Sequence, residues 1–185
     1  MDEWQVAPGR VLALAQGDIT RIPADAIVNA ANSHLGGGGG VDGAIHSAGG
    51  PAIMADLERR YGPPGVRSCP TGSAVVSAAG TLPASWVIHA VGPVWQGGRS
   101  GEAELLASAY RSSLQVAVEI GARTVAFPSI STGIFGYPLE LAAPVAVAAA
   151  REAWAAHTDA IDVVAFYLYS EREFDEFMHA GESVG

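Results

Sequence analysis

The feature that most constrains the fold is the alternation of strand-like and helix-like segments along the chain. Short apolar runs rich in β-branched residues, which favour strands, are separated by longer stretches in which apolar residues recur with helical spacing. The expected strands are Val11–Gln16, Asp25–Ala30, Ser73–Ser77, Trp86–Val91, Thr124–Phe127 and Ile161–Tyr169. The expected helices are Val41–Ala48, Pro51–Tyr61, Gly101–Ile120, Pro138–His157 and Glu171–Ala180. This alternation predicts an α/β layered fold in which helices cover both faces of one sheet.

Three loops that follow expected strands carry the polar and glycine-rich motifs of the chain. They are GDIT at 17–20, NAANSHLGGGGGVDG at 29–43 and PSISTGIFGYP at 128–138. Ligands bind at the carboxyl ends of the strands in α/β sheets. We therefore expect the three loops to converge on one site.

Composition and charge exclude several classes of protein. The 185 residues are 49% hydrophobic and 16% charged, which predicts one globular domain spanning residues 1–185. The net charge is −9 and all ten basic residues are Arg, so Schiff-base chemistry on Lys, a phosphate-loop Lys and a basic nucleic-acid stripe are all excluded. The single cysteine, Cys69, rules out an internal disulfide and a multi-Cys zinc site. The sequence shows no membrane span or signal peptide, so we expect a cytoplasmic protein.

The run of five glycines before Val41 admits three interpretations. Gly38, Gly40 and Gly43 satisfy the G-x-G-x-x-G dinucleotide pattern, but the loop is too long for the tight first turn of that motif. A purely structural loop is the second possibility. The third is an anion site, in which bare backbone N–H groups at a helix N-terminus hold a phosphate. An acidic chain without Lys needs such groups to bind an anionic ligand.

Other catalytic patterns are weak. No G-x-S-x-G nucleophile elbow is present, and the five histidines show no paired metal spacing, so we expect no metal site. His46 follows Asp42 by four residues and shares its helix face, where it serves either the carboxylate or the core. Taken singly, Asp18, Asn29 and Asn32 are consistent with turn or loop residues that satisfy the backbone.

Taken together, the motifs resemble the macrodomains, and among them the MacroD-type ADP-ribosyl hydrolases. The similarity covers nearly the whole chain and includes GDIT, DAIVNAAN at 25–32, GGGGVDGAIH at 37–46, CPTG at 69–72, LPA at 82–84, VIHAVGP at 87–93 and AFPSISTGIFGYP at 126–138. The chain departs from the family at Gly36, Ser47, Gly49 and Phe135, where a larger apolar residue, Arg, Ala and Tyr are usual. These departures leave the central constellation in place.

The resemblance implies a three-layer α/β/α fold with a mixed, mostly parallel sheet and a cleft for ADP-ribose. In that cleft Asp18 takes the adenine amino group beside Ile19, and Leu168–Tyr169 closes over the ring. Asn32 and Asp42 face the distal ribose as the catalytic pair. The diphosphate lies between two loops, formed by Gly39, Gly40 and Val41 on one side and by Ser131, Thr132, Gly133, Ile134 and Phe135 on the other.

The implied activity is removal of mono-ADP-ribose from Asp and Glu side chains, with deacetylation of O-acetyl-ADP-ribose as related chemistry. Glycosidases usually need a second carboxyl group to protonate the leaving oxygen, whereas a carboxylate leaving group needs no such acid because its ordinary pKa is about 4. A non-catalytic ADP-ribose reader and a hydrolase of ADP-ribosylated nucleic-acid ends remain alternatives. We expect a monomer that needs no cofactor, no metal and no membrane, and whose partners are ADP-ribose and mono-ADP-ribosylated proteins.

Overall fold

A single mixed sheet forms the centre of the molecule. The computed structural model describes residues 2–7, 9–156 and 159–183. In these ranges the sheet has seven strands, in the order β1-β2-β7-β6-β3-β5-β4. The strands are β1 (Asp2–Ala7), β2 (Arg10–Gln16), β3 (Ala24–Ala30), β4 (Ala74–Ala78), β5 (Ala84–Ala90), β6 (Thr124–Phe127) and β7 (Val163–Leu168). The two edge strands, β1 and β4, pair antiparallel to their neighbours and the others pair in parallel. The expected mixed, mostly parallel sheet is therefore confirmed.

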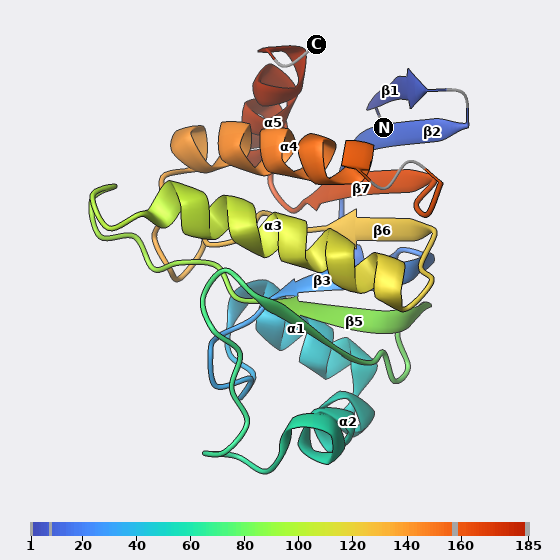
Figure 1. The fold of residues 1–185 in the computed structure, drawn as a ribbon, viewed down its shortest axis with the longest axis vertical. Helices are drawn as coiled ribbons and strands as arrows, with labels where there is room; N and C mark the ends of the chain where they lie inside the picture. The colour runs from blue at the N-terminus through green and yellow to red at the C-terminus, as the bar shows by residue number, and fades with distance from the viewer. Residues whose placement is uncertain (1, 8, 157–158, 184–185) are drawn as a thin grey trace.

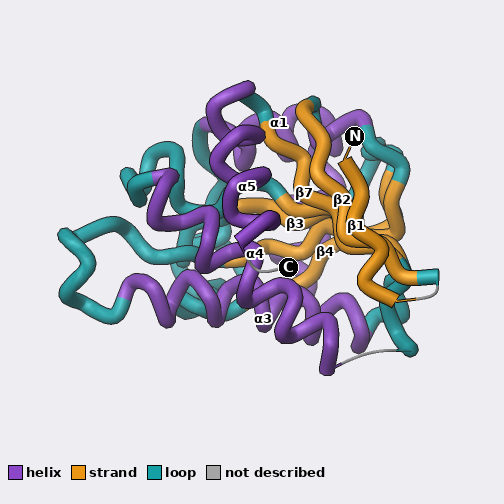
Figure 2. Tube along the Cα trace, turned by 90° about the horizontal axis from the view of Figure 1, so that it is seen from above, coloured by secondary structure: helices purple, strands orange, loops and turns teal. Residues whose placement is uncertain are grey.

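Helices cover both faces of this sheet, which completes the three layers. They are α1 (Gly40–Gly49), α2 (Pro51–Tyr61), α3 (Glu102–Glu119), α4 (Leu139–Ala156) and α5 (Glu171–Ser183), with a short 3-10 turn η1 (Ile19–Arg21). In Figure 1, α3 and α4 run side by side across the strands, and Figure 2 shows α1 and α3 on opposite sides of the sheet. None of the helices in the described ranges has the length and apolar character needed to span a membrane.

Strand alternation divides the buried side chains between two cores. Val28, Ile88 and Phe127 pack with α3, α4 and α5. Ile27 and Val87, which directly precede Val28 and Ile88 in the sequence, pack with α1 and α2. Successive side chains of a strand point to opposite faces, so a strand covered on both faces must be apolar at nearly every position. Each such side chain contributes about 1.5–3 kcal/mol when fully buried. The apolar strand segments therefore hold the carboxyl ends of the central strands in fixed positions.

The predicted elements agree with the structure in type and differ at some ends. The strand β1 and the turn η1 were not predicted from the sequence. DEWQVA is short and alternates polar and apolar residues only over residues 3–6, and it pairs antiparallel with β2. The helix expected at Pro138–His157 begins at Leu139, and its expected last residue, His157, lies outside the described residues.

Candidate active site

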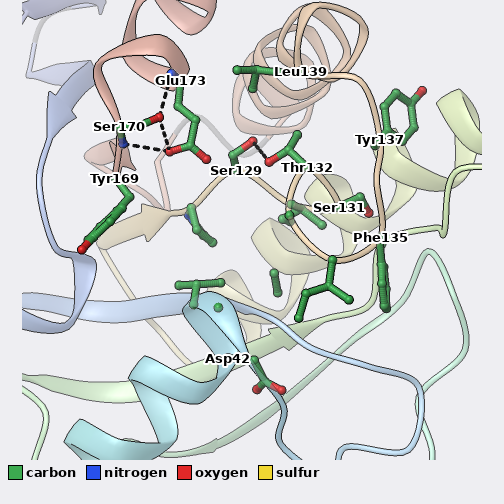
Figure 3. A pocket seen from close by; sticks show the side chains of 18 of the residues that line it. Asp42, Ser129, Ser131, Thr132, Phe135, Tyr137, Leu139, Tyr169, Ser170 and Glu173 are labelled. Atoms are coloured by element: carbon green, nitrogen blue, oxygen red, sulfur yellow. Dashed lines mark hydrogen bonds between the residues drawn. The ribbon is translucent and has the colours of Figure 1, made fainter.

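The three predicted loops line one cleft of about 1150 Å³ at the carboxyl ends of the central strands. Their expected convergence is confirmed, because the neighbouring strands β2, β7, β6 and β3 all point their carboxyl ends to this edge. Figure 3 shows Asp42 on one wall of the pocket and Ser131, Phe135 and Tyr137 on another. The residues predicted to form the catalytic pair, the adenine amino-group site and the two diphosphate loops all line the cleft, namely Asp18, Ile19, Asn32, Gly39, Gly40, Val41, Asp42, Ser131, Thr132, Gly133, Ile134 and Phe135.

The glycine loop brings bare backbone to the start of α1. Gly39 is the N-cap of this helix and has no side chain to satisfy the first-turn N–H groups, which remain free for an anionic group. Gly40 has a φ of 60°, a conformation that residues with a Cβ rarely adopt. A Cβ on Gly43 would lie 2.6 Å from the carbonyl oxygen of Gly38, so the loop folds back on the helix more closely than any larger residue permits. The open N–H groups and the helix dipole make this an anion-binding wall.

Asp42 is the buried carboxylate of the cleft. Its Oδ1 accepts a hydrogen bond of 2.6 Å from Asn29 Nδ2 on β3 and lies 3.3 Å from His46 Nε2, one helical turn further along α1. Its Oδ2 lies on the side of the glycine loop, where a Cβ built on Gly38 would be 3.0 Å away. One oxygen is thus anchored by two side chains, while the other lies toward the loop that lines the cleft.

The sequence predicted the two partners of Asp42 unequally. Asn29 was expected near the end of the strand Asp25–Ala30 and was given no role beyond satisfying the loop backbone, but it lies inside β3 and is fully buried. The i, i+4 spacing of Asp42 and His46 did indicate that the two share a face, and the contact between them is confirmed. No local pattern marks Asn29 as a partner of Asp42, because the contact joins a strand to the following helix.

Asn32 lines the cleft, but its side chain is largely occupied by its own loop. Its Nδ2 donates to the Gly37 carbonyl at 2.9 Å, and its Oδ1 accepts from the N–H groups of His34 and Gly36 at 3.1 and 3.3 Å. The loop-satisfying role that the sequence left open is therefore present in the structure. A contact from Asn32 to a distal ribose or to a water molecule remains a prediction, for which the second Nδ2 hydrogen is available.

The opposite wall is a tight loop fixed by its own backbone and by the segment that follows β5. Ser131 has a φ of 69°, and its carbonyl accepts from the N–H of Tyr137 at 3.0 Å. The carbonyl of Phe135 accepts from the N–H of Trp95 at 2.8 Å, and the Trp95 and Tyr137 rings meet at a tilt of 49° with centroids 4.5 Å apart. Phe135 is thereby held against the cleft.

The two walls meet at the tip of this loop. Ile134 is 79% exposed, and a Cβ on Gly39 would lie 3.2 Å from its Cδ1. The side chain of Ile134 therefore lies over the start of α1. This apolar contact links the two loops at the edge of the cleft.

At the β2 end of the cleft, Asp18 caps the turn η1. Its Oδ1 accepts from the hydroxyl and the backbone N–H of Thr20 at 2.7 and 3.0 Å, and its Oδ2 lies 3.4 Å from Arg21 Nε. The hydrogen bonds from the Thr20 hydroxyl and N–H lower the pKa of Asp18 below its ordinary value, and Arg21 acts in the same direction. Asp18 is therefore an ionised acceptor at the cleft surface.

Leu168–Tyr169 was expected to close over the adenine at this end of the cleft, and the expectation is wrong for Leu168. Tyr169 lines the cleft and is 83% exposed, whereas Leu168 is fully buried in the core beneath α4 and α5. Tyr167, in the strand β7, lines the cleft together with Tyr169, which follows the strand. The reason is the strand alternation, which places positions 167 and 169 on the same side and 168 on the other.

Metal ligation has no support in this cleft. Across the described ranges, no three His, Cys, Asp or Glu side chains come close enough to hold a metal ion together. Asp42 and His46 supply only two such groups, fewer than the three protein ligands of a typical catalytic zinc site.

Comparison with known proteins gives consistent matches. The model of the Macro domain family matches residues 28–146. A Macro domain-containing protein of Cupriavidus necator is 54% identical over 90% of this chain and 94% of its own, and one of Streptomyces coelicolor is 54% identical over 90% and 95%.

Solved structures agree with the sequence relatives. A glycine-to-valine mutant of the Oceanobacillus iheyensis macrodomain with ADPR superposes with a TM-score of 0.89 at 33% identity, covering 99% of this chain and 97% of the other. The Trypanosoma brucei macrodomain in complex with ADP-ribose gives a TM-score of 0.81 at 37% identity over 94% of this chain and 69% of the other.

Proposed function

This chain belongs to the Macro domain family, and from that premise we propose that it binds ADP-ribose in its cleft and hydrolyses esters that join ADP-ribose to Asp or Glu side chains. The observation that carries the catalytic part is Asp42. It is a buried carboxylate with one oxygen anchored by Asn29 and His46 and the other lying toward the glycine loop. Such a group suits a positioned base or a water-orienting residue.

Binding in the proposed mode needs little positive charge. The first-turn N–H groups of α1 and the backbone of the Ser131–Phe135 loop line two walls of the cleft, and a diphosphate between them is held by hydrogen bonds and by the helix dipole. Asp18 accepts the adenine amino group at the other end. Relatives in this fold have been solved with ADP-ribose and with ADP, which supports the assignment. We expect free ADP-ribose to bind near the micromolar range, roughly −8 kcal/mol.

The proposed chemistry is displacement of a carboxylate by water. Asp42 Oδ2 accepts a hydrogen bond from the water, whose oxygen forms a bond to C1″ of the distal ribose as the bond from C1″ to the ester oxygen breaks. That bond's electron pair leaves with the Asp or Glu carboxylate. The water proton that is hydrogen-bonded to Asp42 passes to Asp42 and then to solvent, and the other hydrogen stays on the new C1″ hydroxyl. The products are ADP-ribose and a free carboxylate. Because this leaving group is already a stable anion, no general acid is needed.

Phe135 and the loop that holds it shield this region from bulk water. The loop is fixed by the Trp95–Phe135 hydrogen bond and the Trp95–Tyr137 ring contact, so the backbone that carries the Phe135 ring is held in place before a substrate arrives. Exclusion of water strengthens the interaction of Asp42 with its proton donor. The same arrangement also suits the acetyl ester of ADP-ribose, which we propose as a second substrate.

One experiment separates the enzyme from a reader. Proteins labelled with ADP-ribose on Asp/Glu, on Ser or on Arg are incubated with the protein, and released label is measured alongside calorimetry with free ADP-ribose. We expect release from the Asp/Glu ester, and retention on Ser and Arg because those leaving groups need an acid. Binding of ADP-ribose without release from any of the three would show a reader. Release from Ser or Arg would contradict the proposed mechanism.

A further inference from the structure

A chain of buried polar side chains continues from Asp42 into the sheet, beyond the cleft. His89 on β5 lies beside Asn29 on β3 in the parallel register, and its Nδ1 is 3.1 Å from Asn29 Nδ2. On the far side, His89 Nε2 lies 2.8 Å from Ser77 Oγ on β4, and the Ser77 hydroxyl is 3.0 Å from the carbonyl oxygen of Ala78. Asn29, His89 and Ser77 are all almost fully buried. None of them lines the cleft.

The hydrogens that join Asp42, Asn29, His89 and Ser77 can be assigned in only one self-consistent way. Asn29 must turn its NH₂ group toward Asp42, because the alternative orientation would set a carbonyl oxygen against a carboxylate oxygen 2.6 Å away. The same NH₂ group faces His89 Nδ1, which must then accept and carry no hydrogen. His89 is therefore protonated on Nε2 and donates to Ser77, and the Ser77 hydroxyl donates to Ala78.

The carbonyl side of the Asn29 amide gives no competing support. Its Oδ1 is buried and has no hydrogen-bond partner among the residues that the structure describes. The amide orientation therefore depends on the two acceptors that face its nitrogen, Asp42 Oδ1 and His89 Nδ1. A hydrogen on His89 Nδ1 would point at the NH₂ group and favour the amide turned round, with Oδ1 toward His89 and also nearer the Asp42 carboxylate.

We propose that His89, held in its Nε2–H form by Ser77, is a positioning residue that fixes the Asn29 amide and through it the carboxylate of Asp42. Its effect on turnover rests on the proposed hydrolysis, whereas the hydrogen assignment does not. The charged or titratable groups that face the His89 ring are His46, with ring centroids 5.8 Å apart, and Asp42. Burial, assisted by His46 and opposed by Asp42, lowers the pKa of His89 to about 3. The ring is therefore neutral at the pH at which cells work.

Two substitutions of His89 separate its two contacts. His89→Asn places an amide oxygen at the position of Nδ1, which keeps the acceptor for Asn29 and loses the contact with Ser77. His89→Gln places its amide at the position of Nε2, which keeps the contact with Ser77 and loses the acceptor for Asn29. Both variants replace the ring by a buried primary amide, so they are matched in chemistry and in the burial of a polar group.

The kinetic readout is single-turnover release of label from an Asp/Glu-linked substrate, with calorimetry of ADP-ribose on the same protein stocks. We expect His89→Gln to lower the rate constant by up to about 10²-fold, the cost of a small misplacement at a reacting centre, while the Kd changes by less than about threefold. His89→Asn should remain within about fivefold of wild type. Equal losses in both variants, or a loss in Kd as large as that in rate, would overturn the positioning role.

A second measurement is independent of hydrolysis and keeps the inference testable if a variant does not fold. Long-range ¹H–¹⁵N NMR of the wild type identifies which nitrogen of the His89 ring carries the hydrogen. We expect hydrogen on Nε2 and a bare Nδ1 from pH 5 to pH 8. Hydrogen on Nδ1, or on both nitrogens, would overturn the proposal. If the wild type shows the expected form but releases no label, the proposed function fails and the hydrogen assignment stands.

Discussion

Asp42 and Asp18 are the two carboxylates of one cleft, and they differ in burial and in the partners that hold them. The side chain of Asp42 is 7% exposed and is held by Asn29 and His46 from a strand and a helix. The side chain of Asp18 is 41% exposed and is held within its own four-residue turn by Thr20 and Arg21. Asp18 follows β2 and Asp42 lies on the helix that follows β3, and strands β7 and β6 lie between β2 and β3 in the sheet.

This difference indicates that the two ends of the cleft have different roles. A buried carboxylate needs partners that satisfy it, and those partners also fix its position, which is what a reacting group requires. An exposed carboxylate in a local turn is already solvated and can accept a ligand amino group at little cost. The Asp42 end is therefore suited to chemistry and the Asp18 end to recognition. Four measurements test this division.

The largest effect is expected from Asp42→Ala. Turnover of an Asp/Glu-linked ADP-ribose ester should fall by about 10²–10⁴-fold, the usual contribution of a positioned base, whereas ADP-ribose should still bind within about tenfold because the backbone wall is unchanged. Single-turnover release and calorimetry measure the two quantities. Asp42→Asn keeps an acceptor for Asn29 and removes only the charge, so it should lose turnover to a similar extent. Full activity in Asp42→Asn would remove the base from the mechanism.

The second test compares the acid sensitivity of the two ends. Native His89 has its pKa lowered to about 3, against an ordinary value of 6.5. The unfolded chain therefore binds a proton below about pH 6.5 that the native state does not, and stability falls as the pH drops. From pH 6 to pH 4.5 the free energy of unfolding should fall by up to about 1.4 kcal/mol per pH unit, as measured by urea titration.

The control for this test is His89→Asn, which should remove the slope. Asp18 has a lowered pKa, so its contribution is present above its ordinary value of 3.8 and is lost only as the pH falls below it. The two ends thus respond in separate pH windows. A slope that persists unchanged in His89→Asn would assign the acid sensitivity to another group.

A smaller effect is expected from Asp18→Ala. The Kd of ADP-ribose and of AMP should both rise by about tenfold, the value of one hydrogen bond to a charged acceptor, and the rate constant at saturating substrate should fall far less than in Asp42→Ala. Asp18→Asn is the control, because it keeps an acceptor for the Thr20 N–H and tests whether the turn or the ligand contact matters. Undiminished binding in Asp18→Ala would place the adenine elsewhere in the cleft.

The smallest effect is expected from metal removal. Exhaustive chelation and dialysis should leave release of label unchanged, because the proposed chemistry assigns the water to Asp42 and not to a metal ion. Activity is compared before and after dialysis, with individual divalent ions added back. Loss of activity that one ion restores would mean that Asp42 and His46 act as metal ligands.

Much of the cleft was predicted because its signals are local. The apolar strand segments, the glycine run before α1 and the loop at 128–138 each have a pattern within about ten residues, and the loops they predicted lie together. The i, i+4 spacing that paired Asp42 with His46 is of the same kind. Sequence also explains why Gly39 and Gly40 stand at the start of α1, since a helix N-terminus that faces an anion needs bare backbone.

The contacts between strands were decided by the tertiary structure alone. The sequence determined that this chain alternates strands and helices and exposes a glycine-rich helix N-terminus beside one acidic residue. It did not determine the strand order, the pairing of β1, or which of Leu168 and Tyr169 faces the cleft. Nor did it join Asn29, Ser77 and His89 behind Asp42, because those residues come from three strands. Periodicity and capping act over a few residues, whereas a buried hydrogen-bond chain exists only once the sheet has brought distant side chains within about 3 Å of each other.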